Sequence, residues 1–283
     1  MKVFDNKRGL SNFLNSLESQ KLSLGFVPTM GALHQGHLGL VKRAVKENDF
    51  TIVSIYVNPT QFDNKLDLVK YPKNVDQDIS LLNKLDFHNL IIFLPTDIEI
   101  YSGNFIKEKF DFRGIDNKME GKYRPGHFDG VATIIKKLFE IVKPNKAYFG
   151  EKDYQQLIIV KKLVNILGMP ILIVGCSTHR DDNGLALSSR NKRLTTFERS
   201  YASKIYKILL STKELFQRQE LSEINSWVKD QFSKDPIIDL EYFEIANNST
   251  LKSTLIINQS TKYRAFIAVH INNVRLIDNI ALN

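Results

Sequence analysis

Short apolar runs rich in β-branched residues alternate with segments of helical periodicity through the first two thirds of the chain. Strands that are apolar on both faces have to be covered on both faces, and the helices between them supply that cover. We therefore predict an α/β fold with a doubly wound parallel sheet. The predicted strands are 24–27, 51–57, 90–94, 147–149 and 171–174, and the predicted helices are 37–47, 74–85, 131–142 and 154–167.

The pattern changes after residue 193. Two helical segments are followed by two strands in which polar and apolar residues alternate and by a short third strand, an order typical of a small α+β unit. We predict a first domain over 1–177 and a smaller C-terminal α+β domain over 178–283, joined by a polar segment at about 177–191. The predicted helices here are 197–216 and 221–232, and the predicted strands are 238–245, 264–270 and 274–277.

Composition narrows the class of protein. The 283 residues are 43% hydrophobic and 25% charged, as in a globular protein with a core. The one cysteine, Cys176, cannot form an intrachain disulfide, and no apolar stretch is long enough to cross a membrane, so we expect a cytoplasmic protein without a membrane partner. The net charge of +8 is spread along the chain, which fits a solubilising surface charge or phosphate-bearing ligands better than nucleic acid.

The first candidate site is a strand-to-helix turn at residues 28–37, Pro-Thr-Met-Gly-Ala-Leu-His-Gln-Gly-His. In a doubly wound sheet, the carboxyl end of a strand and the N-terminus of the next helix form a ligand crevice in which free N–H groups favour phosphate. Gly31 and Gly36 let a ligand approach the backbone, and His34 and His37 can direct N–H groups to one phosphate. The alternative is an ordinary turn that carries two surface histidines.

The His-x-Gly-His spacing resembles the nucleotide motif of adenylyl-transferring enzymes, and the chain as a whole resembles the pantothenate synthetase family. The segment Gly-Glu-Lys-Asp-Tyr-Gln-Gln at 150–156 is specific to that resemblance. The other matching segments are 53–62 (Val-Ser-Ile-Tyr-Val-Asn-Pro-Thr-Gln-Phe), 124–131 (Arg-Pro-Gly-His-Phe-Asp-Gly-Val), 187–191 (Leu-Ser-Ser-Arg-Asn) and 275–279 (Arg-Leu-Ile-Asp-Asn).

The resemblance implies a Rossmann-like nucleotide-binding first domain and an AMP-forming ligase that joins (R)-pantoate to β-alanine. In that family the pantoate carboxylate attacks the α-phosphorus of ATP and releases pyrophosphate. The β-alanine amine then attacks the acyl carbon of pantoyl adenylate and expels AMP, which leaves pantothenate, a coenzyme A precursor. Both steps depend on positioning and on neutralised phosphate charge rather than on an enzyme nucleophile. A homodimer is also implied.

The residue pattern and the resemblance together assign roles to residues. Lys152 is expected to be exposed at the sheet edge, Asp153 to cap the helix that follows, and Glu151 fits a structural role equally well. The expected catalytic side chains are His34, His37, Lys152 and Arg190. ATP is expected at Met30, Gly31, Ala32, Leu33, His34, Gln35, Gly36, His37, Gly150, Glu151, Lys152, Asp153, His179, Leu187, Ser188, Ser189 and Arg190. Pantoate and β-alanine are expected at Asn58, Gln61, Arg124, His127 and Gln156, with Met30, Phe62 and Tyr71 as apolar walls.

Mg²⁺ is expected to accompany the ATP phosphates, with no certain protein ligand. Asp76 or Asp78 is the candidate to approach it through water, although their spacing directs them to different faces of a helix. His179 stands where the family has a small aliphatic residue near adenine, so its effect on ATP binding stays open.

Two other functions compete with this interpretation. A nucleotidyltransferase that keeps the adenylate as its product shares the His-x-Gly-His site but has no need of the paired Gln61 and Gln156. A regulatory or RNA-binding protein with a nucleotide fold would bind ATP without substrate-dependent release of pyrophosphate. An assay of ATP with pantoate, with and without β-alanine, separates the three.

Overall fold

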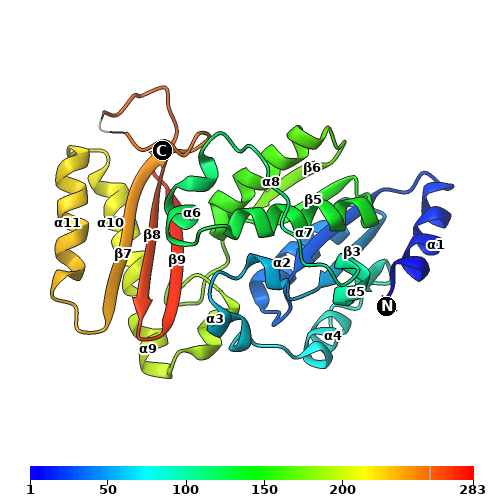
Figure 1. Cartoon of the computed structure of the whole chain (residues 1–283). Coiled ribbons are helices and arrows are strands. Elements are labelled where there is room, and N and C mark those ends of the chain that lie inside the picture. Colours follow the sequence, from blue (N-terminus) through cyan, green and yellow to red (C-terminus); the bar gives the residue numbers. More distant parts are fainter. Residues whose placement is uncertain (255) are drawn as a thin grey trace.

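The computed structural model describes residues 1–254 and 256–283, and its strands form two sheets (Figure 1). The larger sheet has six strands, all parallel, in the order β1-β4-β3-β2-β5-β6. This confirms the predicted doubly wound α/β architecture. The strands are β1 (Lys2–Phe4), β2 (Leu24–Thr29), β3 (Phe50–Ile55), β4 (Leu90–Phe93), β5 (Lys146–Gly150) and β6 (Leu172–Cys176).

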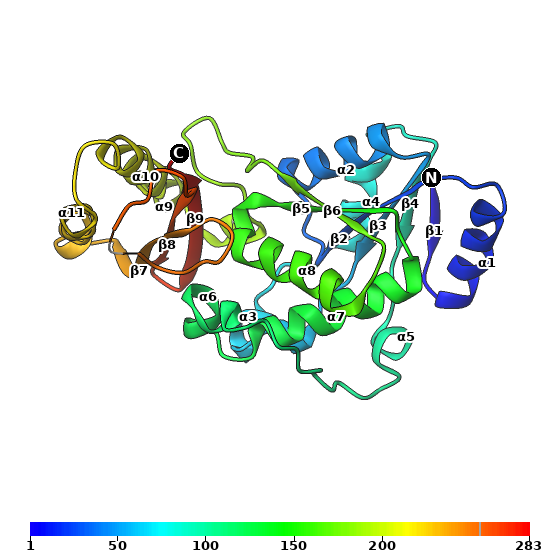
Figure 2. The ribbon, with the colours of Figure 1, turned by 90° about the horizontal axis from the view of Figure 1, so that it is seen from above.

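Helices cover both faces of the larger sheet, as its apolar strands require (Figure 2). Helices α1, α7 and α8 enclose one core with Phe26 and Phe139, and α2 and α4 enclose the other with Val41 and Leu82. The helices are α1 (Lys7–Glu18), α2 (Gln35–Glu47), α3 (Lys65–Val69), α4 (Val75–Asn83), α5 (Asp97–Tyr101), α6 (Met119–Tyr123), α7 (His127–Val142) and α8 (Tyr154–Leu167). Three 3-10 turns join them, η1 (Pro59–Gln61), η2 (Ile115–Asn117) and η3 (Glu151–Asp153).

The strand order reverses between β2 and β5. From β2 the chain proceeds outward through β3 and β4, and from β5 it proceeds the other way to β6. Such a switch point opens a crevice at the carboxyl ends of the two strands. The turn 28–37 follows β2 and the segment 150–156 follows β5, so the topology brings these two motifs to one place.

The smaller sheet is antiparallel, in the order β7-β8-β9. Helices α10 and α11 cover one face around a core that includes Ile208, Val228 and Ile267, and β9 lies on the side of the larger sheet (Figure 1). The elements are η4 (Ser189–Arg193), α9 (Thr196–Tyr201), α10 (Lys204–Leu215), α11 (Leu221–Ser233), β7 (Ile238–Asn247), β8 (Tyr263–Ile271) and β9 (Val274–Ala281). The domain boundary at residue 177 stays a prediction.

Some elements differ from expectation. The single helix predicted over 197–216 is wrong, because the chain breaks between α9 and α10. Ala202 and Ser203 keep right-handed backbone angles at the break, so the apolar stripe continues although the helical hydrogen bonding does not. Strand β1 and helix α1 were not predicted, nor were the short helices α3, α5 and α6. Across the described part of the chain, no helix is both long and apolar enough to span a membrane.

Candidate active site

A cavity of about 240 Å³ opens at the switch point between β2 and β5. Most of the predicted site residues line it. They are Met30, His34, Gly36, His37, Asn58, Gln61, Arg124, His127, Gly150, Lys152, Asp153, Gln156, His179, Leu187, Ser188, Ser189 and Arg190, together with Phe62 and Tyr71. Five of the residues expected to contact ATP do not line it, namely Gly31, Ala32, Leu33, Gln35 and Glu151.

The turn after β2 is held from behind by Asp78 of α4. Gly31 and Ala32 have φ angles of 77° and 50°, a left-handed conformation that glycine adopts without strain. The buried Asp78 carboxylate accepts the N–H groups of Ala32 at 2.8 Å and Leu33 at 2.7 Å, one on each oxygen. Asp78 therefore shapes the turn, and its approach to Mg²⁺ through water stays a prediction.

The other candidate, Asp76, is exposed in the first turn of α4. Among the residues that the structure describes, no three His, Cys, Asp or Glu side chains lie together so as to hold a metal ion. The expectation that Mg²⁺ accompanies the ATP phosphates stays a prediction.

The two histidines stand together at the N-terminus of α2, with ring centroids 4.0 Å apart. Nδ1 of His34 accepts the N–H of Gly36 at 3.2 Å, so the proton of the neutral ring is on Nε2. Burial, the neighbouring ring of His37 and the charge of Lys152 lower the pKa of His34 to about 3. Burial and Lys152 lower the pKa of His37 to about 4, so both rings are neutral at pH 7.

Nδ1 of His37 is buried, and no described residue lies within hydrogen-bonding distance of it. Buried polar groups usually find partners, so the protein leaves the hydrogen bonding of this cavity-lining ring incomplete. The two rings line the cavity rather than the outer surface, contrary to the alternative of two surface histidines.

Lys152 lies in η3, directly after β5. Its side chain is 17% exposed, so the expectation of an exposed lysine is wrong, because the cavity walls cover most of its stem. Nζ lies 3.3 Å from Oδ1 of Asp153. Asp153 occupies the N-cap position of α8 but its side chain makes no capping hydrogen bond there, so the expected cap is also wrong. The carboxylate turns to Lys152 instead.

On the far side of the cavity, Asn58 and Gln61 form a small amide network. Nδ2 of Asn58 donates to Oε1 of Gln61 at 3.1 Å, and Oδ1 of Asn58 accepts the hydroxyl of Tyr101 at 2.6 Å. Nε2 of Gln61 lies 3.0 Å from the sulfur of Met30. The polar atoms of Asn58 are therefore occupied by protein, and it positions Gln61. Gln156, which also lines the cavity, makes no side-chain hydrogen bond with a described residue.

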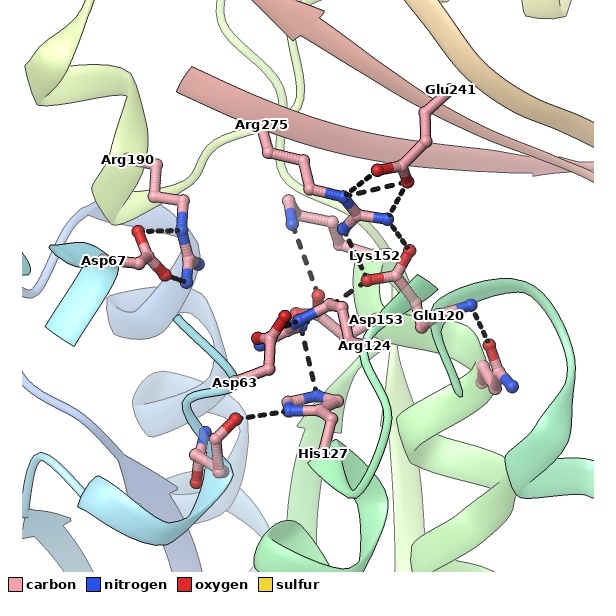
Figure 3. Close-up of polar contacts among 12 residues, drawn as sticks. Asp63, Asp67, Glu120, Arg124, His127, Lys152, Asp153, Arg190, Glu241 and Arg275 are labelled. Carbon is pink, nitrogen blue, oxygen red and sulfur yellow. Dashed lines mark hydrogen bonds and ion pairs between the residues drawn. The ribbon is translucent and has the colours of Figure 1, made fainter. Parts of the chain in front are cut away.

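His127 and Arg124 lie beside this network (Figure 3). Nδ1 of His127 donates to the carbonyl oxygen of Gln61 at 2.7 Å, and Nε2 accepts from Arg124 at 3.2 Å. Burial and the charge of Arg124 lower the pKa of His127 to about 3. The guanidinium of Arg124 is shared between Asp63 at 3.2 Å and Glu120 at 3.5 Å. Protein carboxylates thus stand where the sequence suggested a substrate carboxylate.

The segment 188–190 ties the joining region to the first motif. Oγ of Ser189 donates to the carbonyl oxygen of Ala32 at 3.2 Å, and Oγ of Ser188 accepts the N–H of Arg190 at 3.2 Å. The Arg190 guanidinium pairs with Asp67 of α3 at 2.6 Å (Figure 3).

The sequence left the effect of His179 open, and Gly39 shows how the chain accommodates this ring. A Cβ atom on Gly39 would lie 2.1 Å from Nε2 of His179, so the absence of a side chain at residue 39 lets the ring lie over α2 in this position.

The sequence did not predict one cluster of contacts, although its Arg275 lies in the matching segment 275–279. Glu120 of α6 accepts from both terminal guanidinium nitrogens of Arg275 in β9, at 2.7 and 2.8 Å (Figure 3). It also accepts from the hydroxyl of Tyr242 at 2.8 Å. Burial alone would raise the pKa of Glu120, but the contacts with Arg275, Arg124 and Tyr242 outweigh it and lower the pKa to about 2. Arg275 also pairs with Glu241 of β7. The partners Glu120 and Arg275 are 155 positions apart in the sequence, so no local pattern indicates them.

The fold and this site define the class first: an α/β protein of nucleotidyltransferase-like fold, with its polar groups gathered at the switch point. The family model of pantoate-beta-alanine ligase matches residues 2–281. The chain belongs to the pantoate–β-alanine ligase family, a family of enzymes that form a carbon–nitrogen bond.

Individual relatives agree with this assignment. The pantothenate synthetase of Flavobacterium psychrophilum is 50% identical over 282 residues, with both chains fully covered. The crystal structure of pantothenate synthetase from Thermus thermophilus superposes with a TM-score of 0.91 at 36% identity, covering 100% of this chain and 99% of that one. The pantoate-beta-alanine ligase of Francisella tularensis, complexed with beta-gamma ATP and beta-alanine, gives 0.80 at 40% identity, covering 100% and 98%.

Proposed function

We propose that this protein condenses (R)-pantoate with β-alanine at the expense of ATP, giving pantothenate, AMP and pyrophosphate through pantoyl adenylate. One observation carries the proposal: His34, His37 and Lys152 share a single cavity with Gln61 and Gln156. A phosphate site alone serves any adenylyl transfer. Amide groups beside it add donors and acceptors for a substrate that carries hydroxyls and a carboxylate.

In the first step, ATP with its Mg²⁺ enters with its phosphates at the N-terminus of α2. The neutral His34 ring offers Nε2–H to phosphate oxygens, His37 offers a second ring nitrogen, and Lys152 supplies positive charge. A pantoate carboxylate oxygen forms a bond to the α-phosphorus while the bond from that phosphorus to the bridging oxygen breaks, so pyrophosphate leaves. Fixed donors favour this step because they need no reorganisation as charge moves.

In the second step, the β-alanine amine forms a bond to the acyl carbon of the adenylate. The bond from that carbon to the AMP oxygen breaks, the nitrogen loses a proton and AMP leaves. We assign Gln61 and Gln156 to pantoate and Gly150 and Asp153 to the ribose. Arg190 is assigned to the triphosphate, for which Asp67 must release it.

The family resemblance supports three further parts of the proposal. ATP arrives with Mg²⁺ on its phosphates, residues 178–283 act as a lid domain over the nucleotide, and the enzyme works in the cytoplasm as a homodimer. Sedimentation of the purified protein tests the dimer, which a single monomeric species would contradict.

Product analysis tests the reaction. Purified protein with ATP, Mg²⁺, pantoate and β-alanine should form pantothenate, AMP and pyrophosphate in equal amounts, and omission of pantoate should abolish all three. Formation of a stable adenylate without pantothenate would instead support a nucleotidyltransferase. ATP binding without pyrophosphate release would support a regulatory protein.

A further inference from the structure

The segment 275–279 resembles the family but has no role in the reaction as described so far. Its last residue, Asn279 in β9, is 3% exposed and reaches across to the larger sheet. Nδ2 of Asn279 donates to two backbone carbonyl oxygens, that of Glu151 at 2.9 Å and that of Lys152 at 2.8 Å. Both carbonyls belong to η3, the turn that carries the Lys152 side chain into the cavity.

A second contact fixes which way the Asn279 amide points. Its Oδ1 accepts from the guanidinium of Arg264 in β8, and a guanidinium can only donate. The oxygen therefore faces Arg264 and the NH₂ group faces the two carbonyls. Arg264 is itself 7% exposed, is bonded to Oδ1 of Asn248 at 3.1 Å, and lies 3.9 Å over the ring of Tyr154.

The neighbouring residue, Asp278, holds a second segment through an ion pair. The carboxylate of Asp278 accepts two nitrogens of Arg180, at 2.6 and 2.9 Å, and Arg180 lies 3.7 Å over the ring of Tyr206. Arg180 follows His179 in the segment between the sheets. Two consecutive residues of β9 thus hold two separate segments that line one cavity.

We propose that Asn279 is a positioning residue for Lys152: by holding both carbonyls of η3, it fixes where the ammonium group meets the phosphates. This rests on the proposed role of Lys152 in the adenylation step. Asparagine suits this position because its oxygen accepts from Arg264 while its NH₂ group donates to both carbonyls. Aspartate has the same size and still accepts from Arg264, but it would direct a carboxylate oxygen at the two carbonyls. A small displacement of a charged group from its productive position lowers the rate of a positioned reaction steeply.

A double-mutant cycle tests the proposal, with Asn279→Asp, Lys152→Ala and the two combined, each assayed by pantoate-dependent exchange of pyrophosphate into ATP. Asn279→Asp should lower kcat about tenfold and leave KM for pantoate within about twofold. Once Lys152 is alanine, adding Asn279→Asp should lower kcat by less than about twofold, because the two residues act as a unit. A further tenfold loss in that background would overturn the proposal.

The cycle also separates this inference from the proposed function. If Lys152→Ala alone keeps the parental rate, the phosphate role of Lys152 is wrong. If Lys152→Ala is impaired but the two losses multiply, only the role of Asn279 is wrong.

Asn248→Ala is the matched control, since it removes another partner of Arg264 and leaves the η3 carbonyls bonded. Its exchange rate should stay within about twofold of the parent. An equal loss in Asn248→Ala and Asn279→Asp would show that sheet stability, not Lys152, is responsible. Should Asn279→Asp fail to fold, Arg264→Lys changes the donor to the same amide and also the 3.5 Å pairing of Arg264 with Glu151, so it perturbs η3 through both contacts. That variant should lower kcat in the parent and leave it unchanged in Lys152→Ala, and equal losses in both backgrounds would contradict the proposal.

Discussion

Two regions of this molecule treat charge in opposite ways. At the switch point, His37 has a buried nitrogen with no described partner, and Lys152 has one carboxylate at 3.3 Å. At the boundary between the sheets, the charges are matched within the protein: Glu120 and Glu241 share Arg275, and Arg180 forms a two-pronged pair with Asp278. Both regions are polar and partly buried. They differ in the partners of their polar groups, which are other protein groups at the boundary and are largely lacking at the switch point.

The difference indicates that the switch point binds ligands and that the boundary holds the two sheets together. Where a polar side chain has few hydrogen-bond partners in the protein, substituting it should change the free energy of unfolding little, but it removes a contact that the side chain offers to a ligand. Groups that complete one another behave in the reverse way, because removing one partner strands the other in a buried place. Activity and stability should therefore separate between the two regions.

The largest effect is expected at the boundary. Arg275→Ala leaves the Glu120 carboxylate, whose side chain is 9% exposed, without its main partner. We expect the free energy of unfolding to fall by about 3–5 kcal/mol, as for other broken buried ion pairs. Urea denaturation measures it. Lys109→Ala, which removes an 82%-exposed partner of Asp129, is the control and should lose less than about 1 kcal/mol. Equal losses in both variants would erase the distinction between the regions.

The next effect is on activity. Lys152→Ala should lower turnover about a hundredfold, close to 3 kcal/mol, because a phosphate contact that is strongest in the transition state is lost. Its unfolding midpoint should stay near that of the parent. Lys146 begins β5, the strand that Lys152 follows, and pairs with Glu47; it supplies the control variant Lys146→Ala, which should keep full turnover. Full activity in Lys152→Ala would contradict the account of the switch point.

The histidines come third. His34→Asn and His37→Asn should each slow adenylate formation at least about tenfold, or about 1.4 kcal/mol, since asparagine keeps an N–H donor but shortens its reach. Asparagine is also a good N-cap, so the His34 variant should keep its stability. Kinetics and melting on the same two proteins decide. Retained kinetics together with lowered melting points would assign these rings to packing.

The smallest effect is an absence of titration. With pKa values lowered to about 3 and 4, His34 and His37 stay neutral as the pH falls from 8 to about 5.5, where a histidine of pKa 6.5 is mostly protonated. NMR of the ring protons of the ligand-free protein should show no titration for either residue in this range. A midpoint near 6.5 for either ring would mean that the site is more open to water than the structure has it.

The sequence predicted the residues at the switch point better than the contacts at the boundary between the sheets. The turn 28–37 and the segment 150–156 were identifiable because their geometry is local, each following an apolar strand directly. Their meeting in one crevice follows from parallel topology. The contacts of Glu120 with Arg275 and of Asn279 with η3 join residues more than a hundred positions apart. No spacing rule in the sequence predicts contacts over such separations. The sequence likewise could not show that Asp78 holds the turn after β2 or that Asn58 positions Gln61, because both roles depend on contacts made in the folded chain.

Exchange of labelled pyrophosphate into ATP tests the central claim most directly, namely that the incomplete polar groups at the switch point serve a separate adenylation step. With pantoate present and β-alanine absent, the enzyme should catalyse exchange, and AMP should accumulate catalytically only after β-alanine is added. Exchange that requires β-alanine would contradict a free adenylate intermediate.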